Sequence, residues 1–259
     1  MFIKQYGSGA GSFLCLHGWS GDHRTFEPLV PYLPPNASLW CADLPGCGAS
    51  DTPACWSLDG LAREIAASFD AVPAPFTLVG NCIGALLGLR AALERPALVR
   101  RIVLIDAFAR WPWYFRVFTA PGWGRYAYAS TFANPIGRWM ANRALASKRT
   151  AASDLTRGFA NVRHDVALHY LDILGELRSP ADFAPIELPI EIVFGVRTFR
   201  AVRESAALWR SVWPWAVVWE LPNAGHLPLR EDPAAVSRIL FQGNTCLLES
   251  LPTSKSAIF

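Results

Sequence analysis

Six short apolar runs alternate with longer segments of helical periodicity, and no other feature limits the possible folds as much. Segments 58–72 and 83–99 carry apolar residues at three- and four-residue spacing, as expected of crossover helices. Continuous apolar runs that end in turns are typical of strands buried on both faces of a parallel sheet. These runs span residues 12–18, 38–46, 76–81, 100–107, 190–196 and 216–226. The sequence therefore predicts an α/β fold with a mostly parallel sheet and helices on both faces.

A long insertion interrupts this alternation. Between Phe108 and Pro185 the sequence is aromatic and lacks clear strand patterns. We expect a mainly helical cap at residues 108–185, with residues 1–107 and 186–259 forming one α/β core. A chain of 259 residues, 52% of them hydrophobic, is long enough to bury a substantial core in a single domain.

Several classes of protein are excluded by composition. No apolar run approaches the roughly 18 to 20 residues of a membrane span, and the N-terminus lacks the basic start and cleavage site of a secretory signal. A net charge of +3 is too small to indicate a nucleic-acid partner. The cysteines show neither paired nor metal-ligand spacing, which predicts reduced thiols in a cytoplasmic protein without a metal or other cofactor. They are Cys15, Cys41, Cys47, Cys55, Cys82 and Cys246.

A strand pattern, a glycine-rich turn and a helix pattern meet at Gly80-Asn81-Cys82-Ile83-Gly84. A sharp turn needs neighbours without Cβ atoms, so that its central side chain can project over the edge of the sheet. The N-terminus of the following helix would favour a thiolate at Cys82 and offer N–H groups to an oxyanion. The alternative is a small buried hydrophobic residue, the usual state of a free cysteine. We expect that state for Cys15 and Cys41, which lie inside strand patterns, while Cys47 is undecided.

The turn resembles the nucleophile turn of the α/β-hydrolase family, in which a serine usually occupies the central position. Residues 221–233, LPNAGHLPLREDP, resemble the histidine loop of that family, and Asp232-Pro233 marks a helix start. The segment from Asp43 to Ser50 resembles its D-x-P-G-x-G-x-S loop. The resemblance extends from Phe13 to about Pro233, apart from the cap. It implies that Cys82 is the nucleophile and His226 its base.

The position of the acid departs from the usual family pattern. In most members the acid follows the strand represented here by residues 190–195, but residues 195–199 contain no carboxylate. Some relatives take it from the end of the strand after the nucleophile helix, where this chain has Asp106. The resemblance therefore implies Asp106 as the acid, although an aspartate at this strand end is also a common structural feature.

The tripeptide His17-Gly18-Trp19 follows the first apolar run and resembles the family's H-G-x turn. In that turn the residue after the glycine supplies one amide of the oxyanion hole. The resemblance thus implies the backbone N–H groups of Trp19 and Ile83 as the oxyanion donors. His17 itself is expected to have a structural role.

Basic residues dominate the predicted cap. Between Arg110 and Arg163 there are nine arginines and lysines, many aromatic residues and a single acid, Asp154. Apolar walls with a basic rim suit a hydrophobic acyl group on an anionic carrier such as an acyl-carrier protein or coenzyme A, and peripheral contact with a membrane would also fit. Alternatively, the aromatic residues form the core of the cap and the arginines a solvated face. Residues 137–143 read as a helix on which Arg138 and Arg143 could flank one groove.

A cysteine nucleophile favours particular substrates. A thiolate that attacks a thioester exchanges one thioester for another, so the acyl-enzyme keeps its transfer potential. Attack on an ordinary ester would form a higher-energy thioester. We therefore expect an acyl thioester or activated ester as substrate. The sequence does not distinguish hydrolysis of the acyl-enzyme from acyl transfer. The alternative, suggested by the vacant acid position and the missing serine, is a non-catalytic binding protein with this fold.

Overall fold

A computed structural model of the chain describes residues 1–242, and the end of the predicted core together with Cys246 lies outside these described residues. Seven strands form one sheet in the order β1-β3-β2-β4-β5-β6-β7. All neighbouring strands are parallel except β1 and β3, which are antiparallel. The strands are β1 (Ile3–Tyr6), β2 (Gly11–Leu16), β3 (Ala37–Ala42), β4 (Phe76–Asn81), β5 (Val99–Ile105), β6 (Ile190–Gly195) and β7 (Val217–Leu221). The predicted fold class is confirmed.

The helices divide between the two faces of the sheet and the cap. The core helices are η1 (His23–Tyr32), α1 (Leu58–Ser68), η2 (Phe69–Ala71), α2 (Ile83–Glu94), η3 (Pro96–Leu98), α7 (Arg200–Val212), α8 (Pro228–Glu231) and α9 (Pro233–Gln242). The cap region contains η4 (Trp113–Phe115), α3 (Arg116–Thr119), α4 (Gly124–Tyr128), η5 (Ala129–Ala133), α5 (Pro135–Ala144), η6 (Ala146–Lys148), η7 (Arg157–Ala160), α6 (His164–Leu174) and η8 (Pro180–Phe183). The described residues contain no helix that is both long and apolar enough to cross a bilayer.

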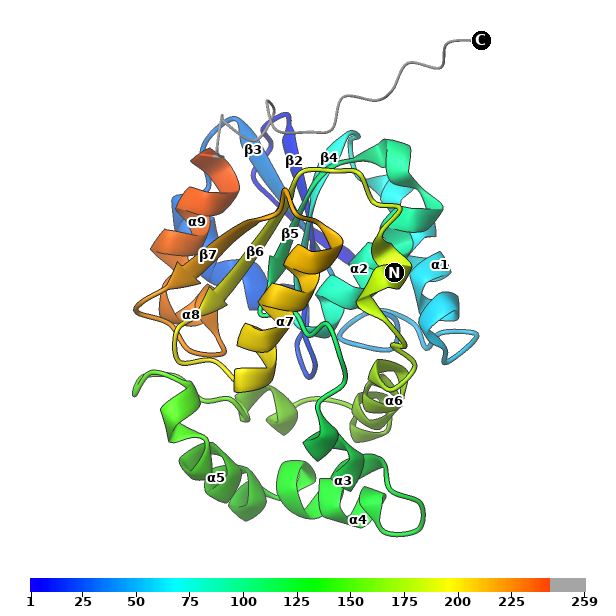
Figure 1. Ribbon diagram of the computed structural model, residues 1–259, viewed down its shortest axis with the longest axis vertical. Helices are drawn as coiled ribbons and strands as arrows, with labels where there is room; N and C mark the ends of the chain where they lie inside the picture. The colour runs from blue at the N-terminus through cyan, green and yellow to red at the C-terminus, as the bar shows by residue number, and fades with distance from the viewer. Residues whose placement is uncertain (243–259) are drawn as a thin grey trace.

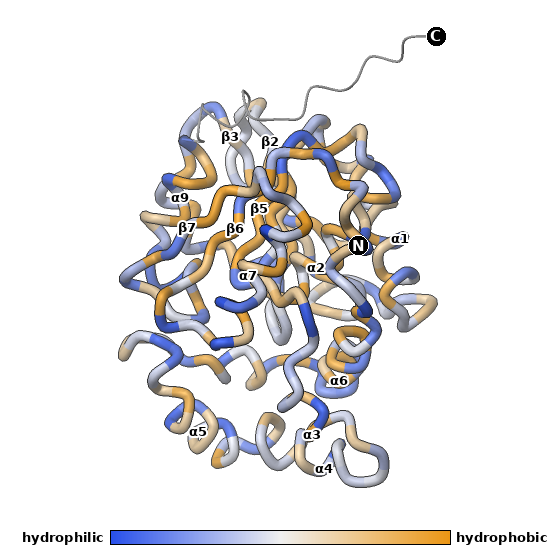
Figure 2. The backbone as a smooth tube through the Cα atoms, viewed as in Figure 1, coloured by the Kyte–Doolittle hydropathy of each residue, from blue (hydrophilic) through white to orange (hydrophobic). Residues whose placement is uncertain are grey.

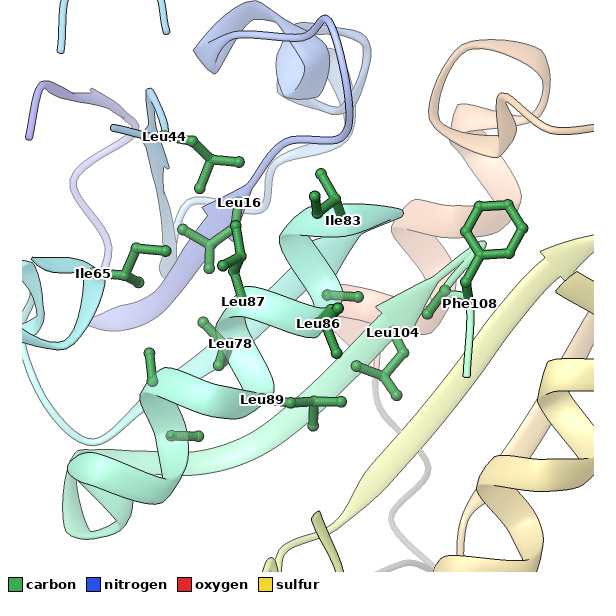
Figure 3. Packing of buried hydrophobic residues seen from close by; sticks show 14 of the residues in the cluster. Leu16, Leu44, Ile65, Leu78, Ile83, Leu86, Leu87, Leu89, Leu104 and Phe108 are labelled. Atoms are coloured by element: carbon green, nitrogen blue, oxygen red, sulfur yellow. The ribbon is translucent and has the colours of Figure 1, made fainter. Parts of the chain in front are cut away.

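Alternate residues of the central strands enter two separate cores. In β5, Leu104 packs with α1, α2 and α7, whereas Val103 packs with η1 and α9. Successive side chains of a strand point to opposite faces, so a strand covered on both sides must be apolar throughout. Figure 2 shows this hydrophobic stretch in the strands at the centre of the molecule. Leu78 and Leu104 from the sheet meet Leu86 and Leu89 from α2 in the larger core (Figure 3).

The six predicted strands are all present, but the sequence pattern did not reveal β1. This strand lies at the edge of the sheet, pairs antiparallel with β3 through residues such as Ile3 and Tyr6, and has no fully buried residue. A half-exposed edge strand has no continuous apolar run to mark it. Its omission left the predicted sheet incomplete at one edge.

The inserted segment forms a layer of short helices beyond the ends of the strands. Figure 1 shows α3, α4, α5 and α6 gathered at one end of the molecule, and the arrowheads of β6 and β7 point toward them. The last part of the predicted cap differs from this expectation, because η8 lies against α7 and α2 and its Phe183 is buried beside Trp209. Residues from about 180 onward therefore pack as part of the core.

Candidate active site

Cys82 occupies the turn between β4 and α2 in a conformation that few residues adopt. Its φ and ψ angles are 52° and −116°, which is strained for a residue with a Cβ atom. A Cβ atom on Gly80 would collide with Ala85, and one on Gly84 would collide with the carbonyl groups that end β2. The two glycines thus allow β4, α2 and β2 to approach closely around the thiol. As the sequence predicted, Cys82 projects at the carboxyl edge of the sheet.

Asp106 and His226 meet at the same edge. Asp106 directly follows β5 and His226 follows β7, and the imidazole Nδ1 lies 2.5 Å from Asp106 Oδ2. Asp106 also has a positive φ of 49° and is fully buried. Because the carboxyl ends of parallel strands gather at one edge, residues far apart in the sequence converge here. The structure brings the predicted acid, base and nucleophile to one place.

Thr198 fills the position at which the family pattern would usually place its acid. Its hydroxyl donates a 2.5 Å hydrogen bond to Asp106 Oδ2, and its oxygen lies 3.2 Å from His226 Nδ1. The backbone N–H of Gly195 donates to the other oxygen of Asp106 at 3.4 Å. These donors stabilise the Asp106 carboxylate and fix its orientation. The sequence analysis noted the missing acid at this position but not this role for the threonine.

The electrostatics of His226 favour its charged form. Burial alone would lower the pKa of the imidazole, but the Asp106 carboxylate and the Cys82 sulfur, both within hydrogen-bonding range, raise the pKa of His226 to about 10. The ring is also enclosed by Phe199 and Phe108, whose centroids lie 4.6 and 6.1 Å from its own. At neutral pH this arrangement favours a charged imidazolium next to Cys82.

Two backbone amides lie where an oxyanion could form. A Cβ atom on Gly18 would come within 3.0 Å of Cys82 Cβ, so the turn that carries Trp19 lies directly against the thiol. Ile83 is the first residue of α2, whose leading N–H groups have no partner within the helix. Among residues 1–242, the N–H of Trp19 likewise has no hydrogen-bond acceptor. Both predicted donors are therefore free to bind an oxyanion.

His17 and Asp43 hold the loops beneath this site. His17 is buried, its Nδ1 lies 2.8 Å from the carbonyl of Gly18, and its Nε2 accepts the N–H of Leu44 at 3.0 Å. Burial lowers the pKa of His17 and keeps it neutral. Asp43 accepts the backbone N–H groups of His23 and Ala49 at 2.6 and 2.8 Å. These contacts fit the structural role expected of His17 and show that Asp43 holds its own loop in place.

Cys47 resembles Cys82 only in lying next to the cavity. It is 6% exposed, and burial raises the pKa of its thiol to about 12. Cys15 and Cys41 are fully buried in strands, as predicted, and Cys55 is exposed. A thiol as difficult to ionise as that of Cys47 is a poor nucleophile, which resolves the question that the sequence left open.

A cavity of about 1260 Å³ opens above Cys82 between the core and the cap. Aromatic rings form part of its lining, and the ring of Trp19 packs against several of them, 4.6 Å from Phe159 and 5.1 Å from Phe132. The indole Nε1 of Trp19 donates to the carbonyl of Ala167 at 2.8 Å, which locks the side chain. The cavity can accommodate a hydrophobic group whose reacting end lies at Cys82.

The cavity lining also contains charged side chains, among which basic residues outnumber acids. Its cations are Arg24, Lys148, Arg157, Arg163 and Arg230, with acids at Asp22, Glu27 and Asp154. Arg138 and Arg143, which the sequence suggested as the flanks of a groove, do not line the cavity. Arg138 donates instead to the carbonyl of Phe132 within the cap. The helix predicted for residues 137–143 is present as α5, but its arginines lie away from the site.

Glu231 joins the histidine loop to the cap. Its carboxylate accepts the N–H groups of Thr150 at 2.6 Å and Gly225 at 2.5 Å, together with the hydroxyl of Ser153. Next to it, the N–H of His226 donates to the carbonyl of Lys148 at 2.8 Å. The cap segment and the loop that carries the base therefore share one set of hydrogen bonds. Sequence reasoning missed this residue, because a glutamate in LPLREDP resembles any exposed helix-end acid.

Comparison with known proteins gives a consistent family. The profile described as "Alpha/beta hydrolase family" matches residues 13–239. The chain also resembles a solved thermophilic esterase from Thermogutta terrifontis, with a TM-score of 0.74 and 17% identity over 93% of this chain and 91% of that one. At that identity the likeness concerns the fold.

Similar curated sequences share one name, pimeloyl-[acyl-carrier protein] methyl ester esterase. The protein of that name from Legionella pneumophila (strain Lens) is 33% identical over 108 residues, a match that spans only 42% of each chain. The one from Nitrosomonas europaea is 25% identical over 247 residues, which cover 89% of this chain and 94% of that protein.

Proposed function

The chain belongs to the alpha/beta hydrolase family, and from that premise we propose that it is a cysteine-dependent enzyme that cleaves or transfers the acyl group of a thioester or activated ester. Cys82 is the nucleophile, His226 the base and Asp106 its orienting acid. The observation that carries the proposal is the imidazole itself, which lies 2.5 Å from the buried Asp106 and has a pKa raised to about 10 by Asp106 and Cys82. A non-catalytic protein has no need to maintain a charged imidazole beside a thiol on a strained turn.

In the acylation step the Cys82 thiolate attacks the carbonyl carbon, and a carbon–sulfur bond forms while the carbonyl electron pair moves to oxygen. The N–H groups of Trp19 and Ile83 stabilise that oxyanion. As the tetrahedral intermediate collapses, the bond to the leaving thiol breaks, and the imidazolium of His226 gives its proton to the departing sulfur. The products are a thioester on Cys82, a free thiol and a neutral His226.

The second step regenerates the ion pair. Neutral His226 takes a proton from water, or from an alcohol or amine acceptor, as its oxygen or nitrogen attacks the acyl-enzyme. Collapse of the second intermediate releases the acid, ester or amide and returns Cys82 to its thiolate form. Hydrolysis and transfer differ only in which acceptor reaches the acyl-enzyme in the cavity.

We further infer an acyl chain held on an anionic carrier, an acyl-carrier protein or coenzyme A. The aromatic residues of the cavity lining suit the chain, and its basic residues, such as Arg157 and Arg230, suit a phosphorylated arm. The names of the similar proteins from Legionella and Nitrosomonas include an acyl-carrier protein substrate, which supports this choice of carrier.

Selective thiol labelling tests the nucleophile. At pH 6 a small alkylating probe should modify Cys82 at least about tenfold faster than any other thiol, because a neighbouring imidazolium stabilises its thiolate. The experiment uses Cys55→Ser protein, since Cys55 is exposed and would contribute background. In His226→Ala the preference should disappear. Equal labelling of Cys82 and the buried cysteines would identify a binding protein instead.

Substrate comparison tests the chemistry. Folded Cys82→Ala, with an unchanged circular dichroism spectrum, should have no turnover. Cys82→Ser should lose activity strongly on acyl-coenzyme A yet keep or gain activity on a methyl ester, because an ester intermediate removes the uphill step. Equal losses on both substrates would contradict the thioester preference.

A second candidate function is hydrolysis of a carrier-bound methyl ester, favoured by the printed names of the similar sequences. A comparison of the same two substrates, the acyl thioester and the methyl ester, distinguishes this candidate from the thioester proposal. Under this candidate the unmodified protein would turn over an acyl methyl ester faster than an acyl thioester of the same chain length, and Cys82 would still be required.

A further inference from the structure

The outer surface of the cap carries an unusual concentration of exposed apolar side chains. The described residues contain ten large apolar side chains that are exposed, and seven of them lie in the cap. These seven are Trp113 (75% exposed), Val117 (38%), Trp123 (55%), Tyr126 (59%), Ile136 (68%), Trp139 (65%) and Met140 (59%). Val117 lines the cavity, and we call the other six the outer cap face. Exposed apolar groups are normally scattered, and their concentration on one layer indicates a surface that contacts something else.

Helix α5 presents its apolar side outward, the reverse of an ordinary surface helix. With about 100° of rotation per residue, Ile136, Trp139 and Met140 form one stripe, and all three are exposed. The opposite side faces the protein with polar or small groups. There Arg138 donates to the carbonyl of Phe132, and the side chain of Asn142 accepts the N–H of Leu155. The apolar stripe is therefore not needed to pack α5 against the cap, because the opposite side of the helix already makes those contacts.

The segment that carries the outer cap face has charge of a single sign. No aspartate or glutamate occurs from residue 107 to residue 153, whereas the same segment has six arginines and one lysine. Arg143 lies within the apolar stripe of α5 and is exposed, and Arg125 lies over the ring of Tyr126, 4.7 Å from its centroid. Long basic side chains can place their stems along apolar surface and their charges in a polar boundary.

We propose that the outer cap face binds the surface of an anionic lipid bilayer. Tryptophan, tyrosine and arginine beside aliphatic residues are the groups that settle at the boundary between headgroups and acyl chains. The cationic field of the cap attracts acidic headgroups. This docking is separate from the chemistry proposed at Cys82, because Ile136, Trp139 and Met140 do not line the cavity.

Two other occupants fit the surface less well. A second copy of the chain would bring two acid-free basic segments together, and the like charges would repel each other. An acidic protein would satisfy the arginines, but it would need pockets for side chains that project with more than half of their surface exposed. A bilayer accommodates such projecting groups without a matching shape. Figure 1 shows α3, α4 and α5 at the extreme end of the molecule, where they can meet a flat surface first.

Vesicle sedimentation tests this proposal with the whole chain. At low salt the protein should pellet with vesicles of phosphatidylglycerol and phosphatidylcholine, and its partition should fall about tenfold with phosphatidylcholine alone. The triple variant Ile136→Ser, Trp139→Ser, Met140→Ser should lose about tenfold or more of the binding to anionic vesicles, and so should Arg143→Glu. The matched controls are Tyr32→Ser, an exposed aromatic residue on η1, and Arg210→Glu on α7, both of which should bind as the unmodified chain does.

The circular dichroism spectrum establishes that each variant is folded, and labelling of Cys82 shows an intact site in the variants that keep this cysteine. Cys82→Ala should still bind the vesicles, so a loss of catalysis cannot be mistaken for a loss of docking. Equal partition of the triple variant and the unmodified chain would overturn the proposal. So would a dimer, detected by light scattering, that the triple variant dissociates. Binding of an acidic carrier protein that depends on the same three residues, in the absence of vesicle binding, would overturn it as well.

Discussion

A hydroxyl group supports the displaced acid of this site. Thr198 donates to Asp106 and lies beside His226 Nδ1, so in the proposed mechanism it would act on the base through the acid, as a positioning residue. Thr198→Val, which keeps the shape and removes the hydrogen bond, should lower kcat roughly tenfold and leave KM nearly unchanged. Thr198→Ser should restore most of the loss. If the valine and serine variants are equally impaired, the threonine acts through packing alone.

The raised pKa of His226 predicts how activity depends on pH. Since the pKa of about 10 depends on the neighbouring Asp106 and Cys82 groups, the ion pair and the activity should persist to about pH 9. In Asp106→Asn the alkaline fall of kcat/KM should begin at lower pH, with a loss of about a hundredfold at neutral pH. His226→Ala should lose more, about a thousandfold, because it removes the proton carrier itself.

The same pKa shift has a consequence for stability. A folded pKa above the unfolded value of 6.5 means that the native state binds this proton more tightly. The stabilisation is complete below pH 6.5 and is lost as pH rises toward 10. The free energy of unfolding, measured by urea titration, should therefore converge for the unmodified chain and Asp106→Asn near pH 10. A constant difference at every pH would show that the aspartate stabilises the fold without this proton.

Introducing Thr198→Asp into Asp106→Asn should restore some activity, because it refills the usual acid position.

Among the structural elements, the histidine loop depends on a residue outside the reacting groups. Burial opposes the charge of Glu231, but hydrogen bonds from Ser153, Thr150 and Gly225 hold the pKa of its carboxyl below the ordinary value. Glu231→Gln leaves amide hydrogens facing these donors and should cost about 2 kcal/mol of stability. Because the folded pKa is lowered, this contribution is present above the ordinary pKa of a glutamate and is lost as pH falls through the folded value.

Urea titration of Glu231→Gln at pH 7 and pH 3 checks this account, and the difference between variant and unmodified chain should shrink at the lower pH. Glu220→Gln provides a control at an exposed position of β7. A difference that is the same at both pH values would mean that the carboxylate charge contributes nothing to the junction.

The sequence predicted elements well where one physical signal dominated. Apolar runs identified every buried strand, and the glycines around Cys82 identified the turn because backbone crowding leaves no other residue possible there. Edge strand β1 and the bond between Glu231 and the cap were missed. Both depend on which segments meet in space, and neither leaves a local pattern in the chain. Asp106 could be chosen because the family resemblance offers the end of the strand after the nucleophile helix as a second position for the acid, while the contribution of Thr198 required coordinates.

At the scale of the whole molecule, the uneven charge of the cavity should govern encounter with substrate. Reversing two exposed cations of its lining, Arg157→Glu with Arg230→Glu, should raise KM for acyl-coenzyme A roughly tenfold, weaken the dependence of KM on salt and leave kcat nearly constant. A small uncharged thioester should show no such change. Arg210→Glu on α7 controls for net charge.

If the double reversal affects the charged and uncharged substrates equally, these cations support the fold of the cavity and do not attract the carrier. Arg138 and Arg143, which the sequence suggested as the flanks of a groove, serve as a second comparison, because neither lines the cavity. Reversal at those positions should leave KM for soluble substrates unchanged.

The shared hydrogen bonds between the cap and the histidine loop act as a mechanical coupling. Thr150 and Ser153 are tied through Glu231 to the loop that holds His226, and Lys148 is bonded directly to the His226 amide. A cap that swings open must either break these bonds or pull the imidazole away from the sulfur. The entrance and the catalyst therefore cannot move independently. Any movement at the entrance would thus be transmitted mechanically to the imidazole.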